Sequence, residues 1–323
     1  MKVGINGFGR IGRCVTRHII DERPDIEIVK INATGNKEIN THLLNYDSVH
    51  GRWKGEVSHL TEWSFTRNIN ECDWDGVDVV LECTGAFTDG LMAQTHLDNG
   101  AKKVIISAPA KNVDRTVVYG VNHQDILPTD NIISNASCTT NCLAPLVKVL
   151  NDNLKILNGQ MTTIHSYTGD QSTVDKRHND LYRARAGAVS MIPTSTGATR
   201  SLGEVIPNMQ GKILGSAIRV PTPNVSAVDL TINVEDYTDE IIVNEMLLES
   251  SMNGMAGIIK YTDEPLVSVD FNGTTESCIF ASEQTRVVDN HCIRVLSWYD
   301  NEWSFSCRLV DTAHHLENVG VNQ

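Results

Sequence analysis

The first part of the chain alternates short apolar runs with stretches of helical periodicity. Apolar runs that predict buried strands occupy residues 2–6, 27–32, 76–82 and 101–107. Helical patterns lie between them, at residues 10–20 and at residues 91–100, where a glycine ends the pattern. Because strands and helices alternate, this part predicts a parallel, doubly wound α/β sheet.

A different pattern begins after Asn135. Helical periodicity at residues 141–155 is followed by longer runs of alternating apolar and polar residues, at 159–165, 212–220 and 226–234. This alternation predicts an α+β domain with a mixed or antiparallel sheet. The segment 169–201 carries few strand signals, and loops of that length are usually functional.

Length and composition narrow the possible classes of protein. A chain of 323 residues is longer than those that usually fold around a single hydrophobic core, which predicts more than one domain. The net charge of −13 disfavours binding to nucleic acid. No apolar run approaches the ~18 residues that span a bilayer, and the first residues lack the pattern of a secretory signal. We therefore expect a cytoplasmic protein without a membrane or nucleic-acid partner.

The cysteines do not form the pattern of a disulfide framework or a metal site. They are scattered along the chain, which favours reduced thiols. Cys138 and Cys142 are close in sequence, but no second Cys or His pair has the spacing of a structural zinc site. We expect no bound metal.

A glycine-rich turn joins the first predicted strand to the first predicted helix. Residues 7–12, Gly-Phe-Gly-Arg-Ile-Gly, fit the G-x-G-x-x-G pattern of dinucleotide-binding proteins. Glycines permit a tight turn and the close approach of a pyrophosphate, which rests on the helix N-terminus. The same pattern predicts an acidic residue ~20 residues later for the ribose 2′-hydroxyl of NAD. The second strand instead ends at Asn32, Ala33 and Thr34, without a carboxylate.

Cys138 is the candidate nucleophile. Small polar residues at 134–137 lead into the helical pattern, so Cys138 is expected at a helix N-terminus. That position lowers the pKa of a thiol and raises its thiolate fraction. The sequence therefore predicts a reactive cysteine.

The chain resembles the glyceraldehyde-3-phosphate dehydrogenase family over nearly its whole length. The segments that carry the resemblance are residues 4–13, 46–51, 82–88, 107–111, 134–145, 165–171, 195–198, 219–226 and 298–303. It implies a Rossmann-type dinucleotide-binding domain at residues 1–137 and 302–323 and a catalytic domain at residues 138–301. It also implies a homotetramer of glycolysis or gluconeogenesis that oxidises glyceraldehyde 3-phosphate with NAD or NADP and inorganic phosphate.

The resemblance implies a role for each matching residue. Cys138 would attack the aldehyde and form a thioester, which inorganic phosphate then cleaves, and His165 would be the paired base. The residues implied for the substrate phosphate are Thr168, Asp170 and Arg219, and those for the attacking phosphate are Ser137, Thr139, Thr196 and Gly197. The residues implied for the cofactor are Gly7, Gly9, Arg10, Ile11, Ala33, Thr34, Arg67, Thr84, Gly85, Ser107 and Asn301.

Two departures from the family pattern concern the cofactor domain and the long loop. The segment between Gly55 and Asp75 is shorter than usual, although Arg67 still matches a residue near the adenine. Ala33 stands where NAD-linked members usually carry an acid, and Lys176-Arg177 stands where they often carry Leu-Pro. The missing carboxylate removes repulsion of a 2′-phosphate, and the two cations can attract one. We therefore add Lys176 and Arg177 to the cofactor residues and expect use of NADP, alone or alongside NAD.

Three other functions remain open at this point. An erythrose-4-phosphate dehydrogenase shares the fold, the cysteine and the histidine, but residues 194–197 and 221–224 resemble the triose enzyme more closely. A semialdehyde dehydrogenase would lack these flanking motifs. A non-catalytic binding protein on the same fold is disfavoured because every expected catalytic residue is present.

Overall fold

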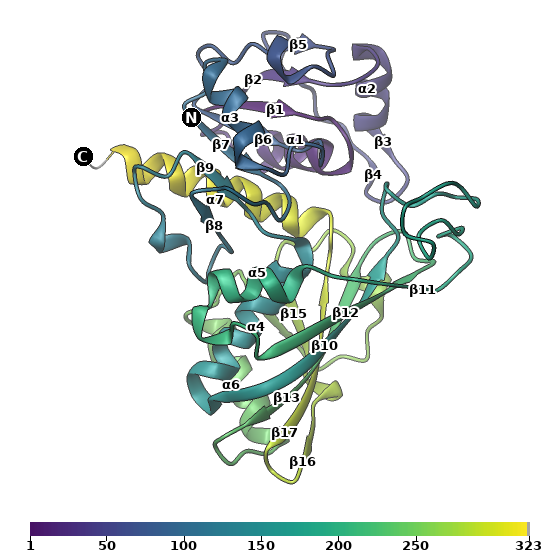
Figure 1. The fold of residues 1–323 in the computed structure, drawn as a ribbon, viewed down its shortest axis with the longest axis vertical. Helices are drawn as coiled ribbons and strands as arrows, with labels where there is room; N and C mark the ends of the chain where they lie inside the picture. The colour runs from purple at the N-terminus through teal and green to yellow at the C-terminus, as the bar shows by residue number, and fades with distance from the viewer. Residues whose placement is uncertain (322–323) are drawn as a thin grey trace. The chain divides into compact units, whose positions relative to one another are not determined.

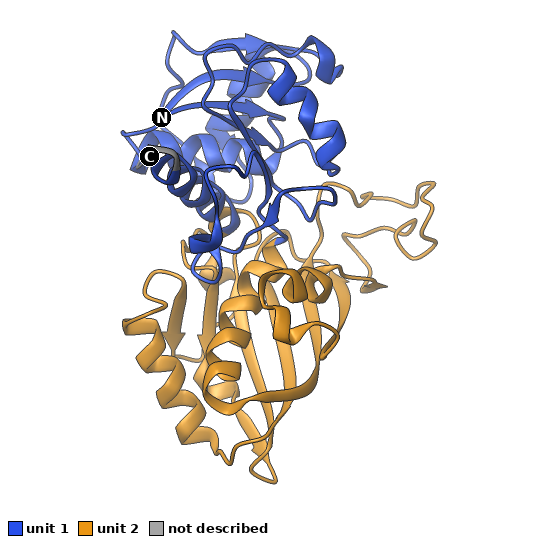
Figure 2. Cartoon of the chain, turned by 60° about the vertical axis from the view of Figure 1, so that its left-hand side comes forward, with its two compact units in different colours: residues 1–137, 305–323 blue, residues 138–304 orange. Residues whose placement is uncertain are grey.

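The computed structural model describes residues 1–321, which divide into two compact units (Figure 2). Unit 1 consists of residues 1–137 together with the C-terminal segment from Phe305, and unit 2 consists of residues 138–304. The sequence placed the second boundary at residue 302. Each unit has its own sheet (Figure 1).

Unit 1 is built on a seven-stranded parallel sheet with the strand order β5-β2-β1-β6-β7-β9-β8. Its strands are β1 (Lys2–Asn6), β2 (Glu27–Asn32), β5 (Glu62–Ser64), β6 (Val79–Glu82), β7 (Lys103–Ile106), β8 (Arg115–Thr116) and β9 (Ile132–Ser134), with β3 (Tyr46–Asp47) and β4 (Gly51–Arg52) as a separate hairpin. Its helices are α1 (Arg10–Glu22), α2 (Lys37–Asn45), α3 (Gly90–Asp98) and most of α7 (Trp303–Val321). The strand order proceeds from β1 to β2 and β5 on one side, and from β6 to β7, β9 and β8 on the other. Ligands of such sheets bind between the two sets, at the carboxyl ends of the strands.

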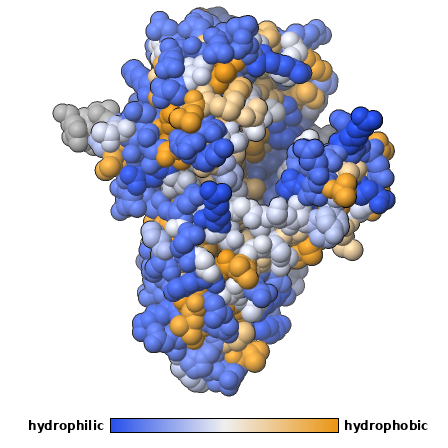
Figure 3. Space-filling view, viewed as in Figure 1, coloured by the Kyte–Doolittle hydropathy of each residue, from blue (hydrophilic) through white to orange (hydrophobic). Residues whose placement is uncertain are grey.

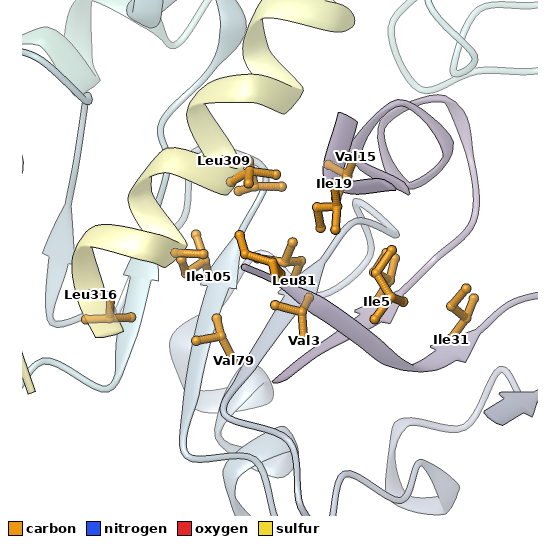
Figure 4. Close-up of a cluster of buried hydrophobic side chains, with 14 of the residues drawn as sticks. Val3, Ile5, Val15, Ile19, Ile31, Val79, Leu81, Ile105, Leu309 and Leu316 are labelled. Carbon is orange, nitrogen blue, oxygen red and sulfur yellow. The ribbon is translucent and has the colours of Figure 1, made fainter. Parts of the chain in front are cut away.

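The core of unit 1 follows from the alternation of side chains along its strands. Val3 and Leu81 face Val15 of α1 and Leu309 of α7 in one buried cluster (Figure 4). Val80 belongs to a second buried cluster, because successive strand residues point to opposite faces. Strands buried on both faces explain why the sequence shows continuous apolar runs.

Unit 2 is built on a mixed sheet with the strand order β11-β12-β10-β13-β17-β15-β14, and β16 pairs with β17. Its strands are β10 (Ile156–Ser166), β11 (Ile192–Thr194), β12 (Ile213–Val220), β13 (Ser226–Val234), β14 (Ile259–Thr262), β15 (Cys278–Ala281), β16 (Arg286–Val288) and β17 (Cys292–Tyr299). Its α-helices are α4 (Cys138–Leu154), α5 (Ala198–Val205) and α6 (Glu240–Met252). The central strand β10 pairs parallel with β12 and antiparallel with β13. The predicted fold class is confirmed.

Short 3-10 helices complete the two units, at Ile69–Glu71, His123–Asp125, Pro207–Met209, Ser268–Phe271 and Ser282–Gln284. Hydrophilic residues make up most of the visible surface, with scattered hydrophobic ones between them (Figure 3). Across residues 1–321, no helix combines the length and the apolar character needed to cross a membrane.

Candidate active site

Cys138 and His165 lie close together in unit 2. Cys138 is the first residue of α4, as the sequence predicted, and His165 is near the end of β10. The Sγ atom of Cys138 lies 3.5 Å from Nε2 of His165. A nucleophile and a base within hydrogen-bonding reach can exchange a proton. The pair therefore has the geometry of an activated cysteine.

The backbone fixes the orientation of the His165 ring. Its Nδ1 lies 2.7 Å from the carbonyl oxygen of Ser166, which can only accept, so Nδ1 must donate. In the neutral ring Nε2 is then unprotonated and faces the thiol. The ring edge also packs against Tyr299, with centroids 6.0 Å apart. His165 is thus oriented to accept a proton from Cys138.

Burial controls the protonation of this pair. Burial and, to a smaller extent, the Arg219 guanidinium lower the pKa of His165 to about 3. Burial raises the pKa of the Cys138 thiol, whereas Arg219 and the N–H of Thr139 act in the opposite direction. The sequence prediction of a lowered thiol pKa is wrong, because loss of solvent outweighs the effect of the helix N-terminus. Burial thus favours the neutral thiol and the neutral imidazole in this pair.

Tyr299 connects the two elements that carry this pair. Its hydroxyl lies 2.9 Å from Oγ1 of Thr139 in α4 and 2.8 Å from Oγ1 of Thr163 in β10. Burial raises the pKa of Tyr299, so the hydroxyl stays protonated. The first turn of α4 is thereby held against the strand that carries His165. Sequence reasoning missed this tyrosine, because its partners are far away along the chain.

A cationic side chain lies beside the base. In the parallel pairing of β10 with β12, Arg219 stands directly opposite His165. Nη1 of Arg219 donates to Oγ1 of Thr168 at 2.7 Å and to the carbonyl oxygen of Ser166 at 3.1 Å. Thr168 in turn donates to Asp170. The structure thus brings together the three residues predicted for the substrate phosphate.

Arg183 joins this group, although sequence reasoning did not select it. Its Nη1 lies 3.4 Å from Asp170 and its Nε donates to Oγ1 of Thr194 at 2.8 Å. The available signal was an arginine inside the long segment 169–201, which the sequence marked as functional. Arg183 also lies 3.9 Å from Asp180, so two carboxylates balance its charge. Arg219, which donates to Thr168 and to the backbone, is then the cation that suits a small anion.

The residues predicted for a second phosphate lie around two helix N-termini. Ser137 immediately precedes α4, and Thr196 and Gly197 immediately precede α5. The N–H of Ala198 donates to Oγ1 of Thr196 at 3.2 Å, and Oγ1 of Thr140 lies 3.5 Å from the carbonyl oxygen of Ala198. The starts of the two helices are therefore adjacent. Gly197 caps α5 without a side chain, which leaves N–H groups of its first turn for an anion.

Asn301 is held by two serine hydroxyl groups. Its Oδ1 accepts from Ser166 at 2.9 Å and from Ser226 at 2.8 Å, which orients the amide and leaves Nδ2 as the donor. Val225, which precedes Ser226, has a φ of 65°, a left-handed conformation that β-branched residues rarely adopt. Strained residues of this kind cluster at functional sites.

Unit 1 contains a pocket of about 770 Å³ at the carboxyl ends of β1, β2 and β6. Of the residues predicted for the cofactor, those that line it are Gly7, Gly9, Ala33, Thr34, Arg67 and Thr84. Within the described chain, its lining includes Arg13 and Arg67 but no Asp or Glu. The pocket therefore favours an anionic ligand despite the negative charge of the whole protein.

The glycines of the first turn meet the demands of a bound pyrophosphate. Gly7 has a φ of 94°, and a Cβ there would lie 2.7 Å from the backbone nitrogen of Thr84. A Cβ at Gly12 would lie 2.1 Å from the carbonyl oxygen of Gly7, so α1 can pack on the turn only with glycine. Gly9 has open space where a Cβ would be, at the N-terminus of α1. These residues fit a dinucleotide.

Other predicted cofactor residues do not line this pocket. They are Arg10, Ile11, Gly85, Ser107 and, in unit 2, Lys176, Arg177 and Asn301. Arg10 donates two hydrogen bonds to Asp47, at 2.5 and 3.0 Å, so a carboxylate holds its guanidinium. Lys176 and Arg177 are exposed residues of the long segment.

Sequence reasoning missed several polar residues of the pocket. Asn6 and Asn32 end β1 and β2, Asn40 lies on α2, and Thr66 follows β5. The sequence did contain a signal for Asn6 and Asn32, because polar residues that end neighbouring parallel strands meet at one edge of the sheet.

Comparison with known proteins gives matches over both units. A family model described as the glyceraldehyde 3-phosphate dehydrogenase NAD binding domain matches residues 1–90, and one described as the C-terminal domain matches residues 137–301. The chain is 51% identical over 324 residues to a glyceraldehyde-3-phosphate dehydrogenase of Cereibacter sphaeroides, covering 97% of each chain. It is 51% identical to that of Xanthobacter flavus and 48% identical to that of Geobacillus stearothermophilus, covering 99% of each chain.

Proposed function

The chain belongs to the glyceraldehyde-3-phosphate dehydrogenase family, and from that premise we propose that it is a phosphorylating enzyme. It oxidises glyceraldehyde 3-phosphate with NAD or NADP and inorganic phosphate to 1,3-bisphosphoglycerate. The observation that carries this proposal is the pair formed by Cys138 and the unprotonated Nε2 of His165, 3.5 Å apart, with Arg219 beside it.

The first chemical step is attack by Cys138 on the aldehyde carbon. Transfer of the thiol proton to Nε2 of His165 makes the sulfur nucleophilic. The imidazolium then gives this proton to the oxyanion formed by the addition, and the neutral Nε2 takes it back when the hydride leaves the hemithioacetal. The bound dinucleotide supplies the hydride acceptor that converts the hemithioacetal to a thioester. We assign the phosphate of the substrate to Arg219 and Thr168. The Thr168 hydroxyl donates to Asp170 in the absence of a ligand, so it must turn from that carboxylate to donate to the phosphate.

The second step is cleavage of the thioester by inorganic phosphate. We assign its binding to the adjacent starts of α4 and α5, with Ser137, Thr139, Thr196 and Gly197. The hydroxyl of Thr139 is engaged by Tyr299, so Thr139 serves this site through the backbone. Two helix N-termini and two hydroxyl-bearing residues match the acceptor oxygens of a phosphate ion. The leaving group is the Cys138 thiolate, which His165 reprotonates.

We assign dinucleotide binding to unit 1 and catalysis to unit 2. The first assignment is supported by the pocket at the carboxyl ends of β1, β2 and β6 and by the glycine turn at residues 7–12. In unit 2, two serine hydroxyl groups leave Nδ2 of Asn301 as its donor, and the resemblance to the family assigns this amide to the nicotinamide carboxamide. The NAD-binding family model supports NAD. Use of NADP rests on Ala33, which leaves the end of β2 without a carboxylate, and on Lys176 and Arg177.

We further propose a homotetramer in the cytoplasm. The outer face of the unit 2 sheet exposes apolar side chains that a partner copy would cover, namely Leu157, Ile164, Leu214 and Ile218. None of the eight cysteines, which all lie in the described part of the chain, takes part in a disulfide, which suits a reducing compartment. Light scattering that shows a stable, active monomer would contradict the assembly.

Steady-state turnover tests the proposed reaction. Glyceraldehyde 3-phosphate with inorganic phosphate should support reduction of NAD or NADP, measured side by side, and omission of phosphate should stop turnover after the acyl step. Erythrose 4-phosphate and a semialdehyde serve as competing substrates. Turnover with either of these but not with the triose phosphate would overturn the assignment, and no turnover with any aldehyde would indicate a binding protein.

A further inference from the structure

Glu82 is a buried carboxylate at the end of β6 that does not itself line the pocket of unit 1. We propose that Glu82, together with His96 and Trp74, is a positioning residue that holds four segments of the pocket, at the ends of β6, β1, β2 and β5, in the arrangement a dinucleotide requires. This inference rests on the proposed function of the pocket. It assigns a role to three residues that the reaction itself does not use.

The carboxylate oxygens of Glu82 hold the ends of two neighbouring strands. Oε1 accepts the backbone N–H of Thr84 at 2.8 Å and also the Thr84 hydroxyl. Oε2 accepts Nδ2 of Asn6, at the end of β1, at 2.5 Å. Asn6 and Thr84 both line the pocket. Because its hydroxyl donates to Glu82, Thr84 has only its backbone and methyl group to present to a ligand.

A third residue, His96, also donates to Glu82. Nε2 of His96 lies 3.0 Å from Oε2 of Glu82, and Nε1 of Trp74 lies 2.8 Å from Nδ1 of His96. An indole can only donate, so Nδ1 of His96 must accept and Nε2 must carry the proton donated to Glu82. In both hydrogen bonds the donor therefore lies on the Trp74 side: Trp74 donates to His96, and His96 donates to Glu82. This leaves the carboxylate as the acceptor of every bond it makes.

Close packing prevents the side chains of Trp74 and His96 from leaving these hydrogen bonds. Trp74 is 1% exposed and His96 is fully buried. A Cβ at Gly4 would lie 2.7 Å from the Trp74 ring, so β1 provides the space for the indole. The ring of Phe87, which lines the pocket, stands edge-on to His96 with centroids 6.3 Å apart. His96 therefore has no room to turn away from Glu82.

Asn6 extends the network to the ends of β2 and β5. Its Oδ1 accepts Nδ2 of Asn32 at 2.8 Å. Oδ1 of Asn32 accepts the Ser64 hydroxyl at 3.0 Å and the backbone N–H of Thr66 at 3.1 Å. Thr66 leads directly into Arg67, in the wall of the pocket. A single carboxylate therefore sets the ends of β6 and β1 directly and those of β2 and β5 through the two asparagines.

This arrangement serves the pocket more than it serves the core. A buried carboxylate does not stabilise a fold unless donors surround it, and well-packed apolar residues often do as well or better. Here Asn6 and Thr84, which supply most of those donors, also face the ligand space. The network thus restricts the motion of the pocket walls before a ligand arrives, which raises affinity by reducing the ordering that binding must impose.

Glu82→Gln tests the proposal with little change in volume. A glutamine side chain has one acceptor oxygen, so the NH2 group must face either the Thr84 donors or the Asn6 and His96 donors. We expect the Kd for NAD, measured by calorimetry on the enzyme without substrate, to rise roughly 10- to 100-fold, as for loss of one or two hydrogen bonds to a charged group. The KM for NAD should rise alongside it. Alkylation of Cys138 without cofactor should keep its wild-type rate.

Two tryptophans provide a matched control for loss of stability. Trp74→Phe removes the donor to His96 and should raise the Kd for NAD. Trp53→Phe removes a similar indole bond, 2.8 Å to Asp21, in a residue that does not line the pocket. It should leave the Kd unchanged at a comparable loss of thermal stability. If either network variant fails to fold, Thr84→Val and Thr84→Ser give the same comparison, because only serine keeps the hydroxyl donor.

Each outcome decides the question. A raised Kd in Glu82→Gln and Trp74→Phe but not in Trp53→Phe supports the positioning role, as does rescue by Thr84→Ser of the loss in Thr84→Val. An NAD affinity within about twofold of wild type in the network variants overturns it, as does an equal rise in Trp53→Phe. A wild type that binds NAD but oxidises none of the aldehydes would refute the proposed function while leaving this measurement valid.

Discussion

His165 and Arg219 donate to the same acceptor, the carbonyl oxygen of Ser166, at 2.7 and 3.1 Å. The base and the cation proposed for the substrate phosphate are therefore separated by a single carbonyl group. This proximity explains why Arg219 contributes to the low pKa of His165 and also favours the Cys138 thiolate. One guanidinium thus lies where it can serve the proposed phosphate binding and influence the protonation of the pair.

Arg219→Leu should impair the phosphorylated aldehyde more than inorganic phosphate. Loss of a charge-assisted donor costs about 1.5–3 kcal/mol, so the KM for glyceraldehyde 3-phosphate should rise roughly 10- to 100-fold. Thr196→Val is the matched variant and should mainly raise the KM for inorganic phosphate. Steady-state kinetics with each ligand varied in turn measures both. Equal effects of both variants on both ligands would show that the two sites are wrongly assigned.

Cys138→Ser should lose nearly all dehydrogenase activity, because an alcohol in this position is almost never ionised. His165→Asn should slow acylation by about 10²- to 10⁴-fold, the range for a general base. A single-turnover measurement of dinucleotide reduction reports that step. Alkylation of Cys138 at neutral pH should also slow in His165→Asn, since the proton acceptor is lost. Equal alkylation rates of Cys138 in the wild type and in His165→Asn would contradict activation by His165.

The pKa of His165 predicts a loss of stability in acid. The folded pKa of about 3 lies below the ordinary value of 6.5, so the unfolded chain binds the extra proton first. The free energy of unfolding should therefore fall as pH decreases from about 6.5 towards 3, and this contribution is fully present above 6.5. Chemical denaturation at several pH values measures the slope. His165→Asn should flatten it, and an unchanged slope in that variant would assign the acid sensitivity to other groups.

Cofactor selectivity should respond to Ala33. Ala33→Asp restores a carboxylate that repels a 2′-phosphate and accepts from the ribose hydroxyls, so the ratio of kcat/KM for NAD over NADP should rise by about one or two decades. Lys176→Leu combined with Arg177→Pro should act in the same direction, mainly through the KM for NADP. Negligible NADP turnover in the wild type, or unchanged NADP kinetics in the double variant, would show that the two loop cations are solvated and play no part.

The sequence alone determined the features that depend on neighbours along the chain. Runs such as residues 2–6 and 226–234 carry the periodicity of strands, and the glycine turn at residues 7–12 follows from local backbone geometry. The start of α4 at Cys138 was also predicted from neighbouring residues, the small polar residues at 134–137. These predictions succeed because the interactions responsible act within a few residues.

Only the tertiary structure decided how distant residues act on one another. The direct pairing of His165 with Arg219 depends on the parallel register of β10 and β12, which no local pattern encodes. The raised pKa of Cys138 follows from burial by elements far along the chain, and it reverses what the helix N-terminus by itself predicts. Glu82 stands within a recognised motif, but its partners His96 and Trp74 meet it only in the folded sheet. Burial and strand register depend on the whole chain, so the sequence predicted the site's residues and the fold set their contacts and protonation.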